Sequence, residues 1–443
     1  MVFSSTIFLF VFLPVVWLAN RFLPRAASNI FLCAASLIFY AWGEPVYVLL
    51  LIFIVMVNYL LAKGINECSL KRARLIAGVV INVSTLFVFK YIDFALDTLN
   101  LLPGVSMPLP GILLPIGVSF FIFQAMSYLI DVYRGICVPQ KSFFKLLLYV
   151  SFFPQLIAGP IIYYHDIERQ IEDRRITSVE TALGIRRFIV GLSKKVLIAN
   201  TLAVAVDAIY ALDFDSLSLS ICWLAALGYI LQLYYDFSGY SDMALGLGRM
   251  FGFSFKENFN YPYVSTSVQE FWRRWHISLS GWFREYVYIP LGGNRKGGLR
   301  TAVNKVTVFF LTGLWHGAQW TFVVWGLIHG AFLLLEQYFK PIRLLGKRTG
   351  WIGGVYTLLV VTFAFVLFRS ENFSQAVAFW RNMVACSRDM GTQVQLVTPM
   401  FITAYLAGII GAAPRIHAVS GWMMNRGAGK VLAALAYKLE RLV

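Results

Sequence analysis

Apolar residues in this chain are grouped into runs separated by short polar or basic stretches. A transmembrane helix needs about 20 predominantly apolar residues, so the shorter runs are expected to extend into their flanks. The pattern predicts an all-α polytopic membrane protein. The runs cover residues 7–20, 30–42, 46–62, 75–88, 114–134, 217–235, 322–339, 355–368 and 401–410.

Two segments interrupt this pattern. Residues 101–115 are rich in proline and glycine, which predicts a loop or a short re-entrant piece. Pro154, Gly159 and Pro160 fall within the apolar stretch 147–161 and should break its helix. A broken helix at membrane depth usually lines a cavity or is buried in protein, and the same is expected of this second break.

The composition supports membrane insertion along the whole chain. Of 443 residues, 59% are hydrophobic and 14% charged, and the mean hydropathy is +0.69. We therefore expect one integral-membrane domain over residues 1–443, with a catalytic core at about 114–340, and no large soluble domain. The five cysteines are widely separated and show neither zinc-site nor disulfide spacing.

The charge of the chain is strongly positive. It has 38 Lys and Arg against 22 Asp and Glu, for a formal net charge of +16. In a membrane protein this excess indicates cytoplasmic loops, and it predicts an external N-terminus with Arg21 and Arg25 inside. The basic residues are scattered between apolar runs, so nucleic acid is not an expected partner.

The first of two histidine-bearing segments lies at residues 270–286. Trp272, Trp275 and Leu279 recur there at three- and four-residue steps, which predicts one helix with an apolar face. His276 falls on that face. The alternative is a core histidine bonded to a backbone carbonyl.

The second segment, residues 306–320, is apolar enough to enter a bilayer. Its periodicity places Thr312, Gly313, His316 and Gln319 on one helical face. Ionisable residues inside a membrane are costly and therefore indicate function. Gly313 and Gly317 form a small-residue pair that allows another helix or a ligand to approach closely, so helix packing with an incidental histidine is the alternative.

Other polar residues have simpler interpretations. If His316 and His329 shared one helix they would lie about 20 Å apart along it, too far for one metal ion, and no zinc-binding motif is present. His165 beside Asp166 is expected to be a solvated loop pair, with a switch or ligand site as the alternative. Asp236 and Asp242, which flank Ser238 and Gly239, suggest a turn in which carboxylates cap or bond between helices.

Two classes of function fit buried histidines among kinked membrane helices. A transporter would use histidine as a proton relay, but internal repeats are not evident and mid-span charges are few. An acyltransferase needs a base, an apolar tunnel that positions a thioester, and donors for the developing oxyanion. No Ser-centred G-x-S-x-G elbow or suitably placed cysteine occurs, so direct base-assisted transfer fits better than an acyl-enzyme.

The segments Arg273-Arg-Trp-His276-Ile-Ser and Leu314-Trp-His316-Gly resemble the two signature histidine motifs of the membrane-bound O-acyltransferases. Further collinear blocks are similar to the bacterial alginate O-acetyltransferase branch, and the peptidoglycan O-acetyltransferases are close kin. These blocks are Met1-Val-Phe-Ser-Ser, Ile38-Phe-Tyr-Ala-Trp42, Leu114-Pro-Ile-Gly117, Ile130-Asp-Val-Tyr-Arg134, Phe153-Pro-Gln-Leu-Ile-Ala-Gly-Pro160, Tyr235-Asp-Phe-Ser-Gly-Tyr-Ser-Asp-Met243 and Leu291-Gly-Gly-Asn-Arg-Lys296.

The resemblance implies a ring of transmembrane and re-entrant helices around a central catalytic tunnel. It implies that His316 is the catalytic base and that His276 orients the donor or polarises its carbonyl. Donor binding is expected of aromatic and basic residues near His276, although the basic ones also fit an ordinary cytoplasmic edge. This donor set is Trp272, Arg273, Arg274, Trp275, Asn294, Arg295 and Lys296, and the expected tunnel-lining set is Gly313, Trp315, Gln319, Asp236, Ser238 and His329.

The expected function is transfer of an acetyl group from a cytoplasmic thioester, acetyl-CoA or another acyl thioester, for O-acetylation of an extracytoplasmic polysaccharide such as alginate or peptidoglycan. The resemblance places the chain in the bacterial cytoplasmic membrane, surrounded by lipid. It also implies a separate extracytoplasmic SGNH or esterase-like acetyltransferase partner, and no bound metal or cofactor. The alternatives are D-alanyl transfer to teichoic acid and a non-catalytic acyl channel that serves a partner transferase.

Overall fold

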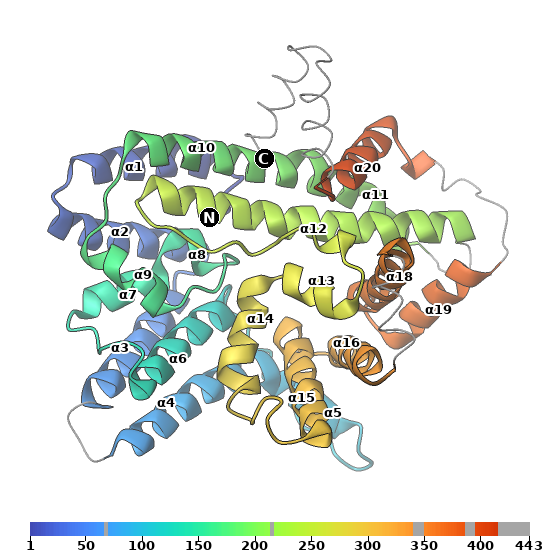
Figure 1. Ribbon diagram of the computed structural model, residues 1–443, viewed down its shortest axis with the longest axis horizontal. Coiled ribbons are helices and arrows are strands. Elements are labelled where there is room, and N and C mark those ends of the chain that lie inside the picture. Colours follow the sequence, from blue (N-terminus) through green and yellow to red (C-terminus); the bar gives the residue numbers. More distant parts are fainter. Residues whose placement is uncertain (66–69, 213–216, 340–349, 386–394, 415–443) are drawn as a thin grey trace. The chain divides into compact units, whose positions relative to one another are not determined.

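The described residues are mostly helical and contain no strand (Figure 1). The computed structural model describes residues 1–65, 70–212, 217–339, 350–385 and 395–414, and His417 lies outside them. Within these described ranges, five helical segments are long and apolar enough to cross a membrane: 47–65, 71–100, 178–210, 320–338 and 350–369. The all-α polytopic class is thereby confirmed, and the ring around a tunnel stays a prediction.

The chain packs as two compact units. The first comprises residues 1–188 and 243–256, and the second comprises residues 189–242 and 257–443. The long helix α12 (Leu219–Met250) contributes residues to both. The prediction of a single domain with a core at 114–340 stays a prediction.

In the first unit, aromatic side chains from distant segments form the core. The rings of Phe8, Phe39 and Phe153 lie 5.6–6.2 Å apart, and all three are fully buried. The helices of this unit are η1 (Phe8–Phe12), α1 (Leu13–Phe22), α2 (Arg25–Ala41), α3 (Tyr47–Ile65), α4 (Lys71–Leu86), η2 (Phe87–Tyr91), α5 (Ile92–Asn100), α6 (Val118–Arg134), α7 (Phe143–Ser151), α8 (Phe153–Leu156), α9 (Tyr164–Glu172) and the first part of α10 (Ser178–Ser193).

Both predicted interruptions are present in this unit. No helix forms between Asn100 and Val118, and the helix through residues 147–161 ends at Ser151, restarts for one turn as α8 and ends at Leu156. Gly117, at the end of the loop, lies against the end of α8. Its φ of 77° is left-handed, and a Cβ on it would lie 2.7 Å from the carbonyl oxygen of Leu156. Only glycine suits this backbone conformation and this close approach.

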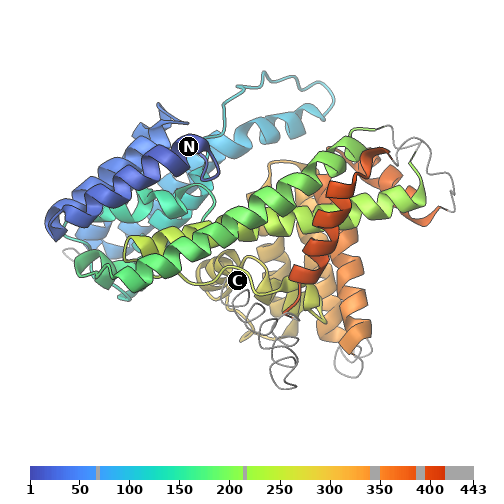
Figure 2. The same cartoon turned by 90° about the horizontal axis from the view of Figure 1, so that it is seen from above.

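The second unit contains the histidine-bearing helices. Residues 178–210 run through α10, the π-helical turn η3 (Lys194–Ala199) and α11 (Asn200–Tyr210) as one continuous helical segment (Figure 2). The remaining elements are η5 (Pro262–Val264), α13 (Val268–Arg274), α14 (Ile277–Phe283), η6 (Arg284–Tyr288), α15 (Gly298–His316), α16 (Trp320–Tyr338), α18 (Gly350–Arg369), α19 (Phe373–Val384) and α20 (Pro399–Gly411).

Helices α15 and α16 form a closely packed hairpin. A Cβ on Gly313 would collide with the backbone carbonyl of Phe322, and a Cβ on Gly326 would lie 3.1 Å from the Cα of Gly313. The close helix approach expected of Gly313 is confirmed. His316 ends α15 and His329 lies on α16, so the condition of a shared helix, under which they would lie about 20 Å apart, is not met.

Two other predicted elements were wrong. The single helix over residues 270–286 is broken at His276, which separates α13 from α14. The turn at Ser238–Gly239 is absent, since α12 continues through it for 32 residues. Ion pairs from Asp236 to Lys195 and from Asp242 to Lys194 (2.6 Å) satisfy these carboxylates, and the helix stays intact around them.

Candidate active site

The break at His276 turns its imidazole into the core. His276 has φ 45° and ψ 56° and is fully buried. A left-handed non-glycine residue costs about 1–3 kcal/mol and persists only where its surroundings hold it. Two backbone bonds do so here: Asn260 N–H to Arg274 O and Ile277 N–H to Asn258 O, both 2.9 Å.

Asn258 determines which nitrogen of His276 carries the proton. Its Oδ1 accepts the backbone N–H of Ser278 at 3.1 Å, which identifies that atom as the oxygen. The same Oδ1 lies 3.3 Å from His276 Nδ1, so a neutral ring donates from Nδ1. Nε2 then carries the lone pair, and it is buried with no hydrogen-bond partner among the described residues.

Histidine and tryptophan rings alternate through the interior of this unit. The contacts link His276 to His316 through Trp315, and His316 to His329 through Trp325, so the structure brings the three predicted histidines into one cluster. The ring-centroid distances are 5.7 Å for His276–Trp315, 4.8 Å for Trp315–His316, 4.9 Å for His316–Trp325, 4.9 Å for Trp325–His329 and 5.2 Å for Trp272–His329.

This cluster contains polar atoms that the protein itself does not satisfy. The indole N–H groups of Trp272 and Trp325 and both ring nitrogens of His329 are buried without a partner among the described residues. Buried polar groups are normally hydrogen-bonded, and exceptions call for an explanation such as a catalytic role. The arrangement offers N–H donors and imidazole acceptors to a polar group that enters an otherwise apolar interior.

A cavity of about 210 Å³ opens beside the cluster. Trp272, Leu279 and Phe309 form part of its apolar wall, and Arg273, Arg284 and Lys305 add three cationic side chains. Both Arg273 and Arg284 are exposed, so the charge lies toward solvent. An apolar cavity with a basic rim suits a ligand with an acyl or pantetheine-like chain and a phosphate group.

The other residues predicted to bind the donor do not line this cavity. Arg274 bonds Glu270 through Nε (3.0 Å) and Nη2 (2.9 Å), and Trp275 is buried against Phe271 and Phe365. Asn294, Arg295 and Lys296 are exposed in the loop between η6 and α15. Of the predicted donor set, Trp272 and Arg273 are therefore the members that this cavity brings together.

The predicted tunnel-lining residues occupy several environments. Trp315 and His329 lie in the ring cluster, Gly313 lies against α16, and Gln319 is exposed at the N-cap of α16. Gln319 is thus not on the helical face expected for it, because α15 ends before it. Asp236 is paired with Lys195, while Ser238 is buried with no partner for its hydroxyl among the described residues.

Two residues of the site were not anticipated. One is Asn258. The other is Glu336, a buried carboxylate on α16 whose oxygens accept the backbone N–H groups of Val268 (2.5 Å) and Gln269 (3.0 Å) at the start of α13. Glu336 thereby anchors the helix that leads to His276. An acidic residue inside an apolar helix was a signal for it, whereas nothing local distinguishes Asn258.

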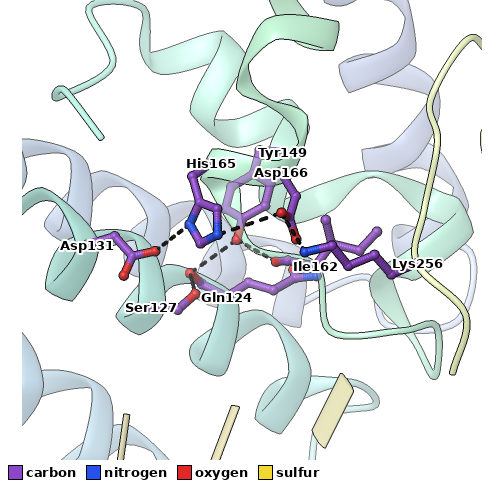
Figure 3. Close-up of polar contacts among 8 residues, drawn as sticks. All are labelled: Gln124, Ser127, Asp131, Tyr149, Ile162, His165, Asp166 and Lys256. Carbon is purple, nitrogen blue, oxygen red and sulfur yellow. Dashed lines mark hydrogen bonds and ion pairs between the residues drawn. The ribbon is translucent and has the colours of Figure 1, made fainter. Parts of the chain in front are cut away.

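A second polar cluster, around His165, lies within the first unit (Figure 3). His165 Nδ1 is 2.9 Å from a carboxylate oxygen of the buried Asp131, and Lys256 Nζ is 2.7 Å from Asp166. The bond to Asp131 raises the pKa of His165. The expected solvated loop pair was wrong, because His165 lies on α9 and its main partner comes from α6. Its side chain is 32% exposed and belongs to a tertiary network.

Comparison with known proteins places this geometry in context. Residues 138–374 match the model of the membrane-bound O-acyltransferase family. The chain is 43% identical over 426 residues to a probable alginate O-acetylase of Azotobacter vinelandii, covering 93% of this chain and 84% of that protein. It is 38% identical over 427 residues to a peptidoglycan O-acetyltransferase of Helicobacter pylori, covering 87% and 80%. A teichoic acid D-alanyltransferase of Bacillus subtilis is 28% identical over 277 residues, covering 58% and 68%.

Proposed function

Because this chain belongs to the membrane-bound O-acyltransferase family and is an acyltransferase, we propose that it moves an acetyl group from a cytoplasmic thioester to a hydroxyl, for O-acetylation of an extracytoplasmic polysaccharide. In this proposal the donor is acetyl-CoA or another acyl thioester. His316 is the base, and His276 assists.

The chemistry follows from a neutral imidazole beside an apolar cavity. The acceptor hydroxyl gives its proton to His316 while its oxygen attacks the thioester carbonyl. A C–O bond forms, the C–S bond breaks, and the proton passes to the leaving thiolate. General base catalysis of this kind contributes about 10²–10⁴-fold to the rate.

The observation that carries the proposal is the linked cluster of His276, Trp315 and His316. It joins the two motif histidines, and the bond from His276 to Asn258 leaves an imidazole nitrogen available inside it. The indole N–H of Trp325 has no partner in the described part of the chain, and its ring lies 4.9 Å from that of His316, so it is suited to stabilise the oxyanion.

The donor would enter through the cavity that Trp272 and Arg273 line. Its phosphates would meet the basic rim formed with Arg284 and Lys305, and its chain would run along the apolar wall. Phosphate recognition by arginine suits this arrangement, since its planar fork binds two phosphate oxygens at once.

The acceptor is proposed from the relatives. Those with the higher identity are named for alginate and peptidoglycan O-acetylation, whereas the D-alanyltransferase shares only 28% identity, so acetyl is the favoured group. The cytoplasmic membrane and a separate SGNH or esterase-like partner that completes the transfer belong to the same proposal.

The decisive experiment measures acetyl content of the exported polysaccharide in cells that carry wild type, His316→Ala or His276→Ala at matched membrane levels. We expect His316→Ala to lose about 10²-fold or more. Thr307→Ala, at a half-buried position on the same helix that lines neither the cavity nor the ring cluster, is the control and should retain full acetylation. Near-normal acetylation with His316→Ala would assign the chemistry to a partner and leave this chain as a conduit.

A further inference from the structure

The first unit contains a second cavity that acyl transfer does not use. Its volume is about 680 Å³, and it lies where α1 ends and α2 begins, beside the C-terminal end of α9. Four cationic side chains and one carboxylate contribute to its lining: Arg21, Lys145, Arg174, Arg175 and Glu172.

Arg174 is held in place before any ligand binds. Its guanidinium donates to Asn29 Oδ1 and, at 2.6 Å, to Ser28 Oγ. Ser28 in turn donates to the buried Asn20 at 2.6 Å, and Asn29 Nδ2 donates to the carbonyl of Ile171 at 2.9 Å. A guanidinium has five N–H donors, so several remain for a ligand.

The charge of Arg174 has no carboxylate partner among the described residues. Its hydrogen-bond acceptors are both neutral, its guanidinium lies 4.8 Å from the ring centre of Phe253, and burial lowers its pKa to about 10. Partly buried charges are normally paired, because desolvation is otherwise uncompensated. The site is therefore built around a cation that lacks an anion.

The neighbouring side chains add further positive charge that is not balanced by carboxylates. Arg21 donates to the carbonyl of Ile176 at 3.2 Å, and neither Arg21 nor Arg175 has an ion pair in the described part of the chain. Lys145, by contrast, is paired with Glu172, which accounts for the one carboxylate in the lining. Three arginines thus remain available to an anion.

Apolar side chains also contribute to the lining, and the cavity lies at the end of an apolar helix. Leu23, Ile30, Phe144 and Ile171 line the cavity, and the short apolar helix over residues 8–22 ends beside it. This combination suits a ligand with a phosphate next to an apolar chain. We propose that the cavity binds a phosphate-bearing amphiphile of net negative charge, such as an anionic phospholipid, with its phosphate among Arg21, Arg174 and Arg175.

The test is a titration of the detergent-purified full chain, stripped of lipid, followed by native mass spectrometry. The probes are phosphatidylglycerol, phosphatidylcholine and inorganic phosphate. The test variant is Arg21→Gln/Arg175→Gln, which leaves the bonds of Arg174 intact. The matched control is Arg72→Gln/Arg300→Gln, which removes two exposed arginines elsewhere.

We expect phosphatidylglycerol to bind wild type and the control equally, and to bind the test variant about tenfold or more weakly, since two charge-assisted contacts are lost. If millimolar inorganic phosphate competes with phosphatidylglycerol, the result supports the phosphate site and indicates a soluble phosphate source. If inorganic phosphate does not compete, the result indicates the lipid. Equal affinity of phosphatidylglycerol for the test variant and wild type would overturn the proposal, as would equal affinity of wild type for phosphatidylcholine. Because the readout is binding, the result is independent of acetyl transfer.

Discussion

The orientation and protonation of the His276 ring depend on Asn258, a residue outside the histidine motif. Asn258 Oδ1 accepts from the backbone N–H and hydroxyl of Ser278 at 3.1 and 2.9 Å, and its Nδ2 donates to Ser241 Oγ at 3.1 Å, so its amide has one defined orientation. The imidazole that faces this amide is consequently restricted to one neutral tautomer. We regard Asn258 as a positioning residue that acts through His276.

Replacing Asn258 tests this role. Asn258→Ala should lower kcat by about 10–100-fold, because a misplaced catalytic group costs this much, while leaving the protein in the membrane. Asn258→Asp retains an acceptor and should recover part of the rate. Its carboxylate favours the protonated ring, so the acid limb of the kcat profile should move to higher pH. Equal losses for both variants with unchanged pH profiles would reduce Asn258 to a structural role.

His165 provides a pH-dependent contribution to stability. Its folded-state pKa is raised, chiefly by the hydrogen bond to Asp131. The pair therefore stabilises the fold fully below the unfolded pKa of about 6.5, and this contribution is lost as pH rises through the higher folded value. We expect His165→Gln to be destabilised by about 1 kcal/mol at pH 6 and by less at pH 9.

Thermal unfolding of the detergent-purified protein at both pH values measures this difference. Asp131→Asn, which removes the partner, should abolish the pH dependence of the His165→Gln effect. A destabilisation that is the same at pH 6 and pH 9 would contradict the assignment of His165 to this pair.

At the scale of elements, α13 is held at its N-terminus by another helix. Glu336 on α16 accepts two of its first backbone N–H groups, and Ser267 accepts a third, from Glu270, at 3.0 Å. Since the first N–H groups of any helix lack internal partners, these bonds fix where α13 begins. The helix then delivers Trp272 and Arg273 to the cavity and leads into His276.

Glu336→Gln keeps the shape of the side chain and weakens this anchor. One of the two oxygens becomes an NH₂ group that cannot accept, so one N–H of α13 is left buried. The variant should lose about 1–3 kcal/mol of stability, and kcat should fall with it. Glu371→Gln, at an exposed site, is the comparison. Thermal stability and acetyl transfer indistinguishable from those of Glu371→Gln would refute the anchor.

The elements that periodicity and turn residues control were predictable. The long apolar helices, the loop at residues 101–117 and the break near Pro154 follow from local sequence. The break at His276 could not be predicted from local sequence, because the tryptophan spacing continues across it. Its left-handed backbone is held by backbone hydrogen bonds to Asn258 O and from Asn260 N–H. The partners of Asp242 and Asp236 within the continuous helix α12 were not predictable either, because Lys194 and Lys195 lie 48 and 41 residues away in sequence.

The candidate site, too, was predictable only where local sequence distinguishes its residues. His276 and His316 stood out as rare ionisable residues in apolar segments, so sequence alone could propose them. Asn294, Arg295 and Lys296 were chosen by residue type and proximity to the motif, but they are exposed in a loop outside the cavity beside the histidines. The tertiary structure determines which basic residues line a cavity, and local sequence does not show it.

At the scale of the whole molecule, charge and helix order together predict the orientation of the first unit. Two apolar helices, α2 and α3, separate Arg21 from the basic start of α4 at Lys71, Arg72 and Arg74. The loop 101–117, which contains no charged residue, follows the next crossing, and the segment that leads to Lys145 follows one more. The positive-inside rule then places Arg21, Arg72 and Lys145 in the cytoplasm and the N-terminus outside.

Cysteine labelling tests this orientation. In a background where the native cysteines are replaced by alanine, Met107→Cys should react with a membrane-impermeant maleimide in intact spheroplasts, and Arg72→Cys should react only after permeabilisation. Both positions are exposed, so access depends on the side of the membrane. The opposite labelling pattern would invert the topology and move the arginine cavity to the outer face.

The left-handed backbone at His276 has an evolutionary consequence. An L-residue with a β-branched or bulky side chain is disfavoured at φ 45°, whereas asparagine, aspartate and histidine adopt this conformation several-fold more often. The backbone therefore restricts position 276 to few residue types, and of these three only histidine carries a ring nitrogen that can serve as a base. In a lineage released from selection for that ring, asparagine or aspartate should replace His276 before any β-branched or aromatic residue does.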